Sequence, residues 1–119
     1  MTKHYELGKE GELLAVDFLL KNQYQVIERN WRFQKAEVDI IARKEDTLIC
    51  VEVKTRASTY HGKPEEFVSK KKIQLLSKAI NEYVQLKDLD VEVRFDIISV
   101  IKTKHHYEIE HIKNAFLHF

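Results

Sequence analysis

The chain contains few of the residues that interrupt or cross-link a fold. Its 119 residues include three glycines, one proline and one cysteine. A lone Cys50 excludes an internal disulfide, and its place in an apolar run predicts a core residue. No apolar run approaches the roughly 18 residues of a membrane span, and the first residues form no apolar signal segment. We therefore expect one domain over residues 1–119, cytoplasmic and without a membrane partner.

The chain also has almost no excess of one charge sign overall, because its net charge is only +1. The distribution is uneven, however, and residues 29–72 hold 11 Lys/Arg against 7 Asp/Glu. A local basic excess attracts polyanions such as nucleic acid. An ordinary solvated surface would give the same count, so the charge pattern alone leaves both interpretations open.

Hydrophobic periodicity predicts the secondary structure. The predicted elements are a helix over 6–21, a strand over 24–27 that extends to 33 in its longer version, strands over 37–42 and 48–54, a loop over 55–66, a helix from the N-cap Ser69 to 86, a strand over 91–101 and a last edge strand over 107–112. The order α-β-β-β-α-β places a crossover helix after a hairpin. Such a helix makes the next strand parallel to the third. The sequence thus predicts an α/β fold with a mixed β-sheet flanked by helices.

Two acids and a lysine fall on the predicted hairpin. Alternation places Glu52 and Lys54 on the same side of their strand. If residues 44–47 form the connector, Asp39 lies directly opposite Glu52, and Glu37 lies opposite Lys54. Like charges paired in this way are about 5 Å apart and repel each other. A cation between them would remove the repulsion, and Mg²⁺ prefers carboxylate oxygens. This combination is typical of a phosphodiesterase site.

Glu12 interrupts the amphipathic pattern of the first predicted helix. It falls on the apolar side, beside Ala15, Val16 and Leu19. An unpaired buried carboxylate is costly, so Glu12 needs a partner. That partner is either a cation in the site formed by the strands or a surface lysine or arginine.

Three consecutive lysines, residues 70–72, begin the second predicted helix. They oppose the positive end of the helix dipole. Free helix amides and ammonium groups together suit a phosphate. A solvated lysine run is the alternative, because the electrostatic mismatch costs little at an exposed site.

A family resemblance is carried by motifs that follow one order along the chain. These are Gly8…Gly11-Glu12…Ala15…Phe18-Leu19, Tyr24…Asn30-Trp31-Arg32, Glu37-Val38-Asp39-Ile40-Ile41, Val51-Glu52-Val53-Lys54-Thr55-Arg56, Lys72…Leu76…Ala79 and Arg94-Phe95-Asp96. They resemble the bacterial YraN-like family, uncharacterised protein family 0102, of the restriction-endonuclease-like PD-(D/E)XK group. Within that group the chain is similar to archaeal Holliday-junction resolvases, which also place a glutamate on the first helix. The resemblance runs from about residue 8 to 116 and implies a restriction-endonuclease-like core.

The resemblance also implies roles for individual residues. Asp39 and Glu52 would be ligands of Mg²⁺ or Mn²⁺, with the backbone carbonyl of Val53 as a further ligand. Lys54 would be the catalytic lysine, and Glu12 would complete the acidic site.

Other matching positions imply contacts around that site. Glu37 would orient Lys54. The chain departs from the named motif at Val38, where the motif has proline, and at Ala36, where many relatives have glycine. Neither departure removes a catalytic group. The side chains expected to bind backbone phosphates are Arg29, Arg32, Arg56 and Lys72.

The function expected from these residues is metal-dependent hydrolysis of phosphodiester bonds by an endonuclease. Nucleic acid is the expected partner, DNA in preference to RNA, with branched or junction DNA as a candidate substrate. A two-fold symmetric junction would call for a homodimer. The alternative is a nucleic-acid-binding module that keeps the nuclease scaffold without turnover, because one fold hosts many functions. A purely structural domain would leave the acidic positions unexplained.

Overall fold

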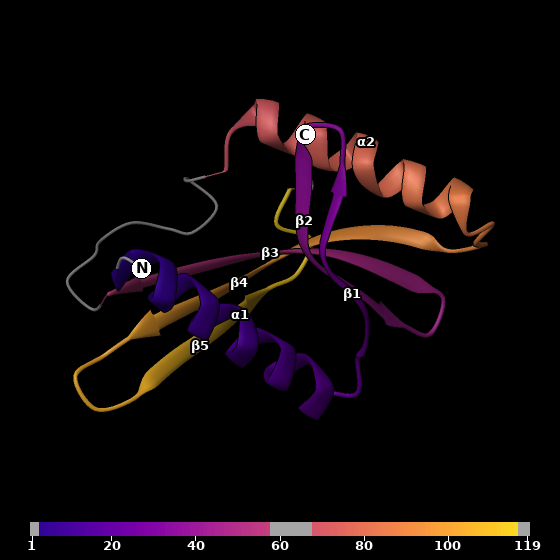
Figure 1. Cartoon of the computed structure of the whole chain (residues 1–119). Helices are drawn as coiled ribbons and strands as arrows, with labels where there is room; N and C mark the ends of the chain where they lie inside the picture. The colour runs from indigo at the N-terminus through magenta and orange to yellow at the C-terminus, as the bar shows by residue number, and fades with distance from the viewer. Residues whose placement is uncertain (1–2, 58–67, 117–119) are drawn as a thin grey trace.

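The computed structural model describes residues 3–57 and 68–116, with side chains from residue 6 onward in the first helix. Its elements are α1 (Lys3–Lys21), β1 (Gln25–Phe33), β2 (Ala36–Lys44), β3 (Thr47–Ala57), α2 (Lys70–Leu86), β4 (Glu92–Lys102) and β5 (Tyr107–Ile112) (Figure 1). The predicted order is confirmed, including the last edge strand. The predicted loop over 55–66 starts later than expected, because β3 continues through Ala57, and its remaining residues lie outside the described part. None of the described helices is long and apolar enough to cross a membrane.

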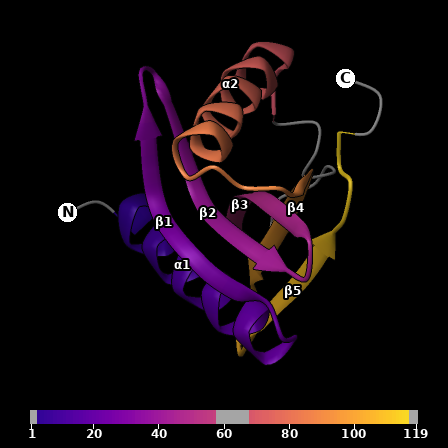
Figure 2. The same ribbon diagram turned by 90° about the vertical axis from the view of Figure 1, so that its right-hand side faces the viewer.

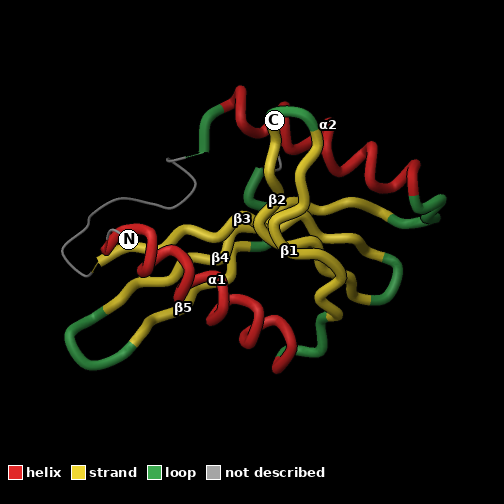
Figure 3. Tube along the Cα trace, in the orientation of Figure 1, coloured by secondary structure: helices red, strands yellow, loops and turns green. Residues whose placement is uncertain are grey.

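All five strands form one mixed sheet in the order β1-β2-β3-β4-β5 (Figure 3). Neighbouring strands are antiparallel except β3 and β4, which are parallel over their full length. The parallel pair is the consequence of α2, which carries the chain back across the sheet between them. The predicted α/β class and mixed sheet are therefore confirmed.

The helices cover opposite faces of the sheet (Figure 2). On one face, α1 packs on an apolar cluster that contains Ala15, Leu19, Ile40, Ile49, Val51 and Ile98. On the other face, α2 packs on a cluster that contains Leu76, Ala79, Ile80, Tyr83, Ile41, Leu48 and Cys50. Cys50 is 2% exposed, so its predicted place in the core is confirmed.

The predicted start of α2 is also confirmed. Ser69 has extended backbone angles, and its Oγ accepts a hydrogen bond of 3.1 Å from the amide of Lys72. A serine in this position satisfies one of the free amides of the first turn.

The connection between β2 and β3 differs from the prediction. It is a two-residue turn of Glu45 and Asp46, with Lys44 paired to Thr47, rather than a four-residue connector. Glu45 adopts a φ of 56°, the left-handed conformation that such a tight turn needs. The strand ends predicted from residue polarity were wrong, because Lys44 and Thr47 are polar and still pair with each other.

Gly11 is the point of closest approach between α1 and the sheet. A Cβ atom built on Gly11 would lie 1.8 Å from Oγ1 of Thr55 on β3. No real side chain tolerates such a distance, so the absence of a side chain at Gly11 allows α1 to lie against β3.

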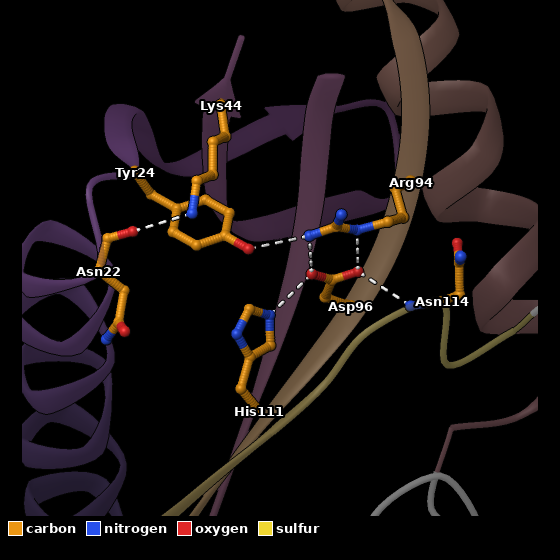
Figure 4. A network of polar contacts seen from close by, with 7 residues as sticks. All are labelled: Asn22, Tyr24, Lys44, Arg94, Asp96, His111 and Asn114. Carbon is orange, nitrogen blue, oxygen red and sulfur yellow. Dashed lines mark hydrogen bonds and ion pairs between the residues drawn. The ribbon is translucent and has the colours of Figure 1, made fainter. Parts of the chain in front are cut away.

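A polar network around the buried Asp96 joins β4, β5 and the segment between α1 and β1 (Figure 4). Asp96 is fully buried and receives two hydrogen bonds of 2.9 Å from Arg94. Nε2 of His111 lies 2.7 Å from Asp96 Oδ2, and the amide of Asn114 donates to Oδ1 at 3.1 Å. Arg94 also donates to the hydroxyl of Tyr24 at 3.1 Å. Both oxygens of the buried carboxylate are thus satisfied from three segments of the chain.

The same contacts keep Asp96 ionised. Burial opposes its negative charge, but the hydrogen bonds from His111, Arg94 and Asn114 outweigh burial and lower the pKa of Asp96. A carboxylate with a lowered folded-state pKa contributes stability above its unfolded value of about 4, and this contribution is lost as the pH falls.

We predict that Gly11→Ala lowers the free energy of unfolding by about 1–3 kcal/mol, because the new methyl group collides with Thr55. Urea unfolding followed by circular dichroism measures the change. The double variant Gly11→Ala, Thr55→Ala should recover part of the loss, because it removes the nearest colliding atoms. Unchanged stability in Gly11→Ala would contradict the proposed role of this contact.

We predict that Asp96→Asn lowers the free energy of unfolding by about 2–4 kcal/mol at neutral pH, because Arg94 keeps its charge without a counter-charge. Unfolding in urea as a function of pH tests the cause. The wild type should lose stability as the pH falls below about 4, and the variant should show a flatter profile. Glu92→Gln, an exposed change on the same strand, is the control and should follow the wild type. Parallel pH profiles of Asp96→Asn and the wild type would refute this explanation.

Candidate active site at a break in the second strand

Asp39 lies where β2 loses its regular pairing on both sides. The register with β3 runs from Lys44 only as far as the pair Ile40–Val51. The register with β1 passes over the pair Asn30–Asp39, and Asn30 has a φ of 53°. Oδ2 of Asp39 instead accepts a hydrogen bond of 2.8 Å from the amide of Val53. A side-chain contact thus replaces the backbone ladder at this point.

This break corrects two register predictions. Asp39 approaches Glu52, as expected, but not as a regular cross-strand pair. Glu37 does not lie opposite Lys54 in the ladder, because β2 has left β3 before it reaches that position. The simple count from the turn failed because it assumed an uninterrupted hairpin.

Asp39 and Glu52 form a closely coupled carboxylate pair. Glu52 is only 4% exposed. Burial, together with the hydrogen bond and the negative charge of Glu52, raises the pKa of Asp39 to about 9. Burial also opposes ionisation of Glu52, but the hydrogen bonds from Asp39 and Lys72 outweigh it and lower the pKa of Glu52. At neutral pH the pair therefore holds one proton on Asp39 and one negative charge on Glu52.

The cation that contacts Glu52 is Lys72, not Lys54. Nζ of Lys72 lies 2.7 Å from Oε2 of Glu52 and reaches it from the first turn of α2. The pKa of Lys72 is raised, because this contact outweighs burial. Burial and the neighbouring positive charge of Lys72 lower the pKa of Lys54, and the charge of Arg56 acts in the same direction. The sequence placed Lys72 among phosphate ligands and gave no signal for this ion pair.

Glu12 and Glu37 are joined by Asn30, a residue to which the sequence assigned no role. With its amide nitrogen turned toward the carboxylates, Asn30 donates to Glu12 at 2.9 Å and to Glu37 at 3.1 Å. Glu37 also pairs with Arg32 at 2.6 Å, and its expected role in orienting Lys54 stays a prediction. Burial raises the pKa of Glu12, with the charge of Arg29 opposing the rise.

Two cavities border these residues. The larger, of about 430 Å³, is lined by Gly8, Lys9, Glu12, Arg29, Asn30, Arg32 and Glu37. The smaller, of about 290 Å³, is lined by Lys35, Ala36, Glu37, Ser69, Lys71, Lys72, Leu75 and Leu76. Three of the four residues expected to bind phosphate therefore line a cavity, and Arg56 lies close enough to affect Lys54.

The carboxylates of the site provide few ligands for a divalent cation. Within residues 3–57 and 68–116, no three His, Cys, Asp or Glu side chains are grouped to hold a metal. Glu12 interacts with Asp39 through its charge, which raises the pKa of Asp39. Asp39 and Glu52 alone supply two adjacent carboxylates, and Mg²⁺ commonly takes one or two from a protein and keeps several waters. The donor set fits such a partly hydrated ion and does not form an all-protein cage.

The structure thus defines an α/β protein with a mixed sheet. Where the pairing of β2 with β3 ends, the sheet presents an interacting carboxylate pair, two lysines and an arginine-lined cavity. The chain belongs to the family described as "Uncharacterised protein family UPF0102", whose sequence profile matches residues 11–100. The predicted family membership is therefore confirmed.

Relatives of the same family match over almost the whole chain. A UPF0102 protein of Flavobacterium psychrophilum is 57% identical over 119 residues, the full length of both chains. One from Christiangramia forsetii is 56% identical, again over both full lengths. One from Bacteroides thetaiotaomicron is 47% identical over 116 residues, which are 98% of this chain and 96% of that protein.

We predict that Asp39→Asn raises the free energy of unfolding by about 1–2 kcal/mol at pH about 8. The folded state keeps a proton that the unfolded chain releases near pH 4, so wild-type stability declines as the pH rises from about 4 toward 9. Asparagine needs no proton and can still accept the hydrogen bond from Val53. Urea unfolding across this pH range is the measurement.

Asp46→Asn, in the exposed turn, is the matched control and should keep the wild-type profile. A wild-type stability that does not decline across this range, or an Asp39→Asn variant less stable than the wild type at pH about 8, would contradict the raised pKa.

Proposed function

We propose that this protein is a metal-dependent endonuclease that hydrolyses phosphodiester bonds in DNA. The observation that carries the proposal is the coupled Asp39–Glu52 pair beside Lys54. Two carboxylates crowded together at a partly buried site cost stability, and a site for a divalent cation accounts for their position. The resemblance to the restriction-endonuclease-like PD-(D/E)XK group, with a metal-binding acid pair and a lysine, also supports the proposal.

The residues that would hold Mg²⁺ or Mn²⁺ are Asp39 and Glu52, with the backbone carbonyl of Val53. When bound, such an ion supplies a more acidic water and neutralises charge on the phosphoryl oxygens. As a ligand Asp39 would be in its deprotonated form, and Glu52 would face the ion in place of Lys72. Glu12 adds negative charge near the pair without a direct place in it.

Lys54 is the residue proposed to act on the reacting group. Partial burial and the positive charge of Lys72 lower the pKa of Lys54, because both destabilise the ammonium form relative to the neutral amine. An ammonium group at this position orients the attacking water or stabilises the charge that develops on the phosphate. Lys72, released from Glu52, contacts a backbone phosphate together with Arg29, Arg32 and Arg56.

A nucleic-acid-binding module without turnover is the second candidate. The specific observation in its favour is the ion pair between Lys72 and Glu52, which already neutralises the one ionised carboxylate of the pair. The lack of a three-acid cluster within the described residues points the same way. Both functions use the same basic side chains, so only metal-dependent product formation separates them.

We predict metal-dependent cleavage of branched, flapped or single-stranded DNA by the full chain in Mg²⁺ or Mn²⁺, and none in EDTA. Asp39→Ala and Glu52→Ala should each reduce the rate at least about a thousandfold, because each removes a ligand of the ion. Asp46→Ala is the control and should cut as the wild type does. Gel analysis of end-labelled DNA, with matched RNA substrates, measures the rates.

Full activity in the double variant Asp39→Ala, Glu52→Ala would overturn the assignment of the site. Salt-dependent DNA binding without any metal-dependent product would select the binding module instead. Sedimentation of the protein alone and with a four-way junction tests the proposed homodimer.

A further inference from the structure

Gly8 of α1 is a glycine that no packing contact within the described residues requires. Glycine in the interior of a helix lowers its stability relative to alanine, so its presence needs a reason. For Gly11 the reason is Thr55, which a Cβ atom would meet at 1.8 Å. A Cβ atom on Gly8 would have no atom of the described residues within 4 Å.

The open space beside Gly8 belongs to the larger cavity. Gly8 lies one helical turn before Glu12, so both face the same side of α1. Arg29, Asn30 and Arg32 of β1 line the cavity with them. Its volume of about 430 Å³ lies within the range of about 300–1,000 Å³ that is usual for ligand sites.

The acidic side chains of this cavity have partners within the protein, whereas its arginines are exposed to solvent. Asn30 donates to both carboxylates, and Arg32 pairs with Glu37 at 2.6 Å, so the acids have partners within the protein. The side chain of Arg32 is nevertheless 76% exposed, and Arg29 is exposed as well. Guanidinium groups in this position can still donate to an external phosphate, for which their planar donor geometry is suited.

The larger cavity shares one lining residue with the smaller cavity. Glu37 lines both this cavity and the smaller one, whose other lining residues include Lys35, Lys71 and Lys72. Lys72 in turn contacts Glu52. Basic side chains therefore line both cavities, and Lys72 links the smaller one to the carboxylate pair.

We infer that the cavity between α1 and β1 binds one nucleotide of the DNA strand, with its sugar against the backbone of Gly8 and its phosphate at Arg29 and Arg32. This inference rests on the proposed function, because it places a part of that substrate. Glycine has no side chain beyond a hydrogen, so it gives a sugar ring the closest approach to a helix backbone. Glycine at position 8 thus lowers the stability of the helix but leaves room for the sugar beside it.

The test separates access from stability. Gly8→Ala and Gly8→Leu are compared with the wild type in EDTA, by thermal unfolding and by anisotropy with a fluorescein-labelled single-stranded oligodeoxynucleotide. Gly8→Ala should raise Tm by about 3 °C and weaken binding a few-fold. Gly8→Leu should weaken binding about tenfold, because its side chain fills the space of the sugar. A merely structural glycine would instead give a lower Tm and an unchanged Kd.

A double-mutant cycle locates the occupant. In the Gly8→Leu background, Arg29→Ala should add little to the loss of binding, because the phosphate has already left the cavity. Arg56→Ala, outside the cavity, should add its full effect and serves as the control. If Gly8→Leu leaves too little folded protein, Gly8→Ala in the same cycle replaces it.

The outcomes distinguish the two proposals. If the wild-type protein binds the oligonucleotide and both Gly8 variants bind it with the wild-type Kd, the cavity assignment is overturned and the proposed function stays intact. Full additivity of Gly8→Leu with Arg29→Ala also overturns the assignment. A wild-type protein that binds no nucleic acid overturns both.

Discussion

The contact between the Asp39 carboxyl group and the amide of Val53 determines how the site is built. It takes a place where a backbone carbonyl would serve in a regular hairpin, so it holds β2 against β3 while the ladder between them ends. The same contact fixes Asp39 beside the buried Glu52. Repulsion between the two is then relieved by a proton on Asp39 and by Lys72 beside Glu52. The end of the β2–β3 ladder, the Asp39–Glu52 pair and the position of Lys72 therefore depend on one another.

The fold was largely predictable from the sequence, because apolar periodicity dominates the energetics of each element. Ile73, Leu76, Ile80 and Tyr83 repeat at helical spacing and are buried in α2. The cap at Ser69 was predictable for a similar reason, since the signal is local. Turn boundaries were less predictable, because polar Lys44 and Thr47 give no sign that they still pair.

The candidate site was predictable only as a set of residues. Alternation on β3 identified Glu52, the expected hairpin register identified Asp39, and the interrupted amphipathic pattern of the first helix identified Glu12. Their partners come from other elements: Lys72 from α2 and Asn30 from β1. Such contacts depend on the left-handed backbone of Asn30 and on the angle at which α2 crosses the sheet. Neither quantity is encoded in a local pattern, so the contacts of Lys72 and Asn30 could not be predicted from the sequence.

The crossover connection has a consequence for the order in which the molecule assembles. The β2–β3 hairpin is local and closes through a two-residue turn, so we expect it to form early. Lys72 arrives only when α2 docks and β4 pairs in parallel with β3, a step of larger sequence separation and slower kinetics. Until then the hairpin carries two adjacent acids without their lysine. A nascent chain therefore carries the buried Glu52 without the lysine that pairs with it, and this ion pair is completed only by the last part of the fold to form.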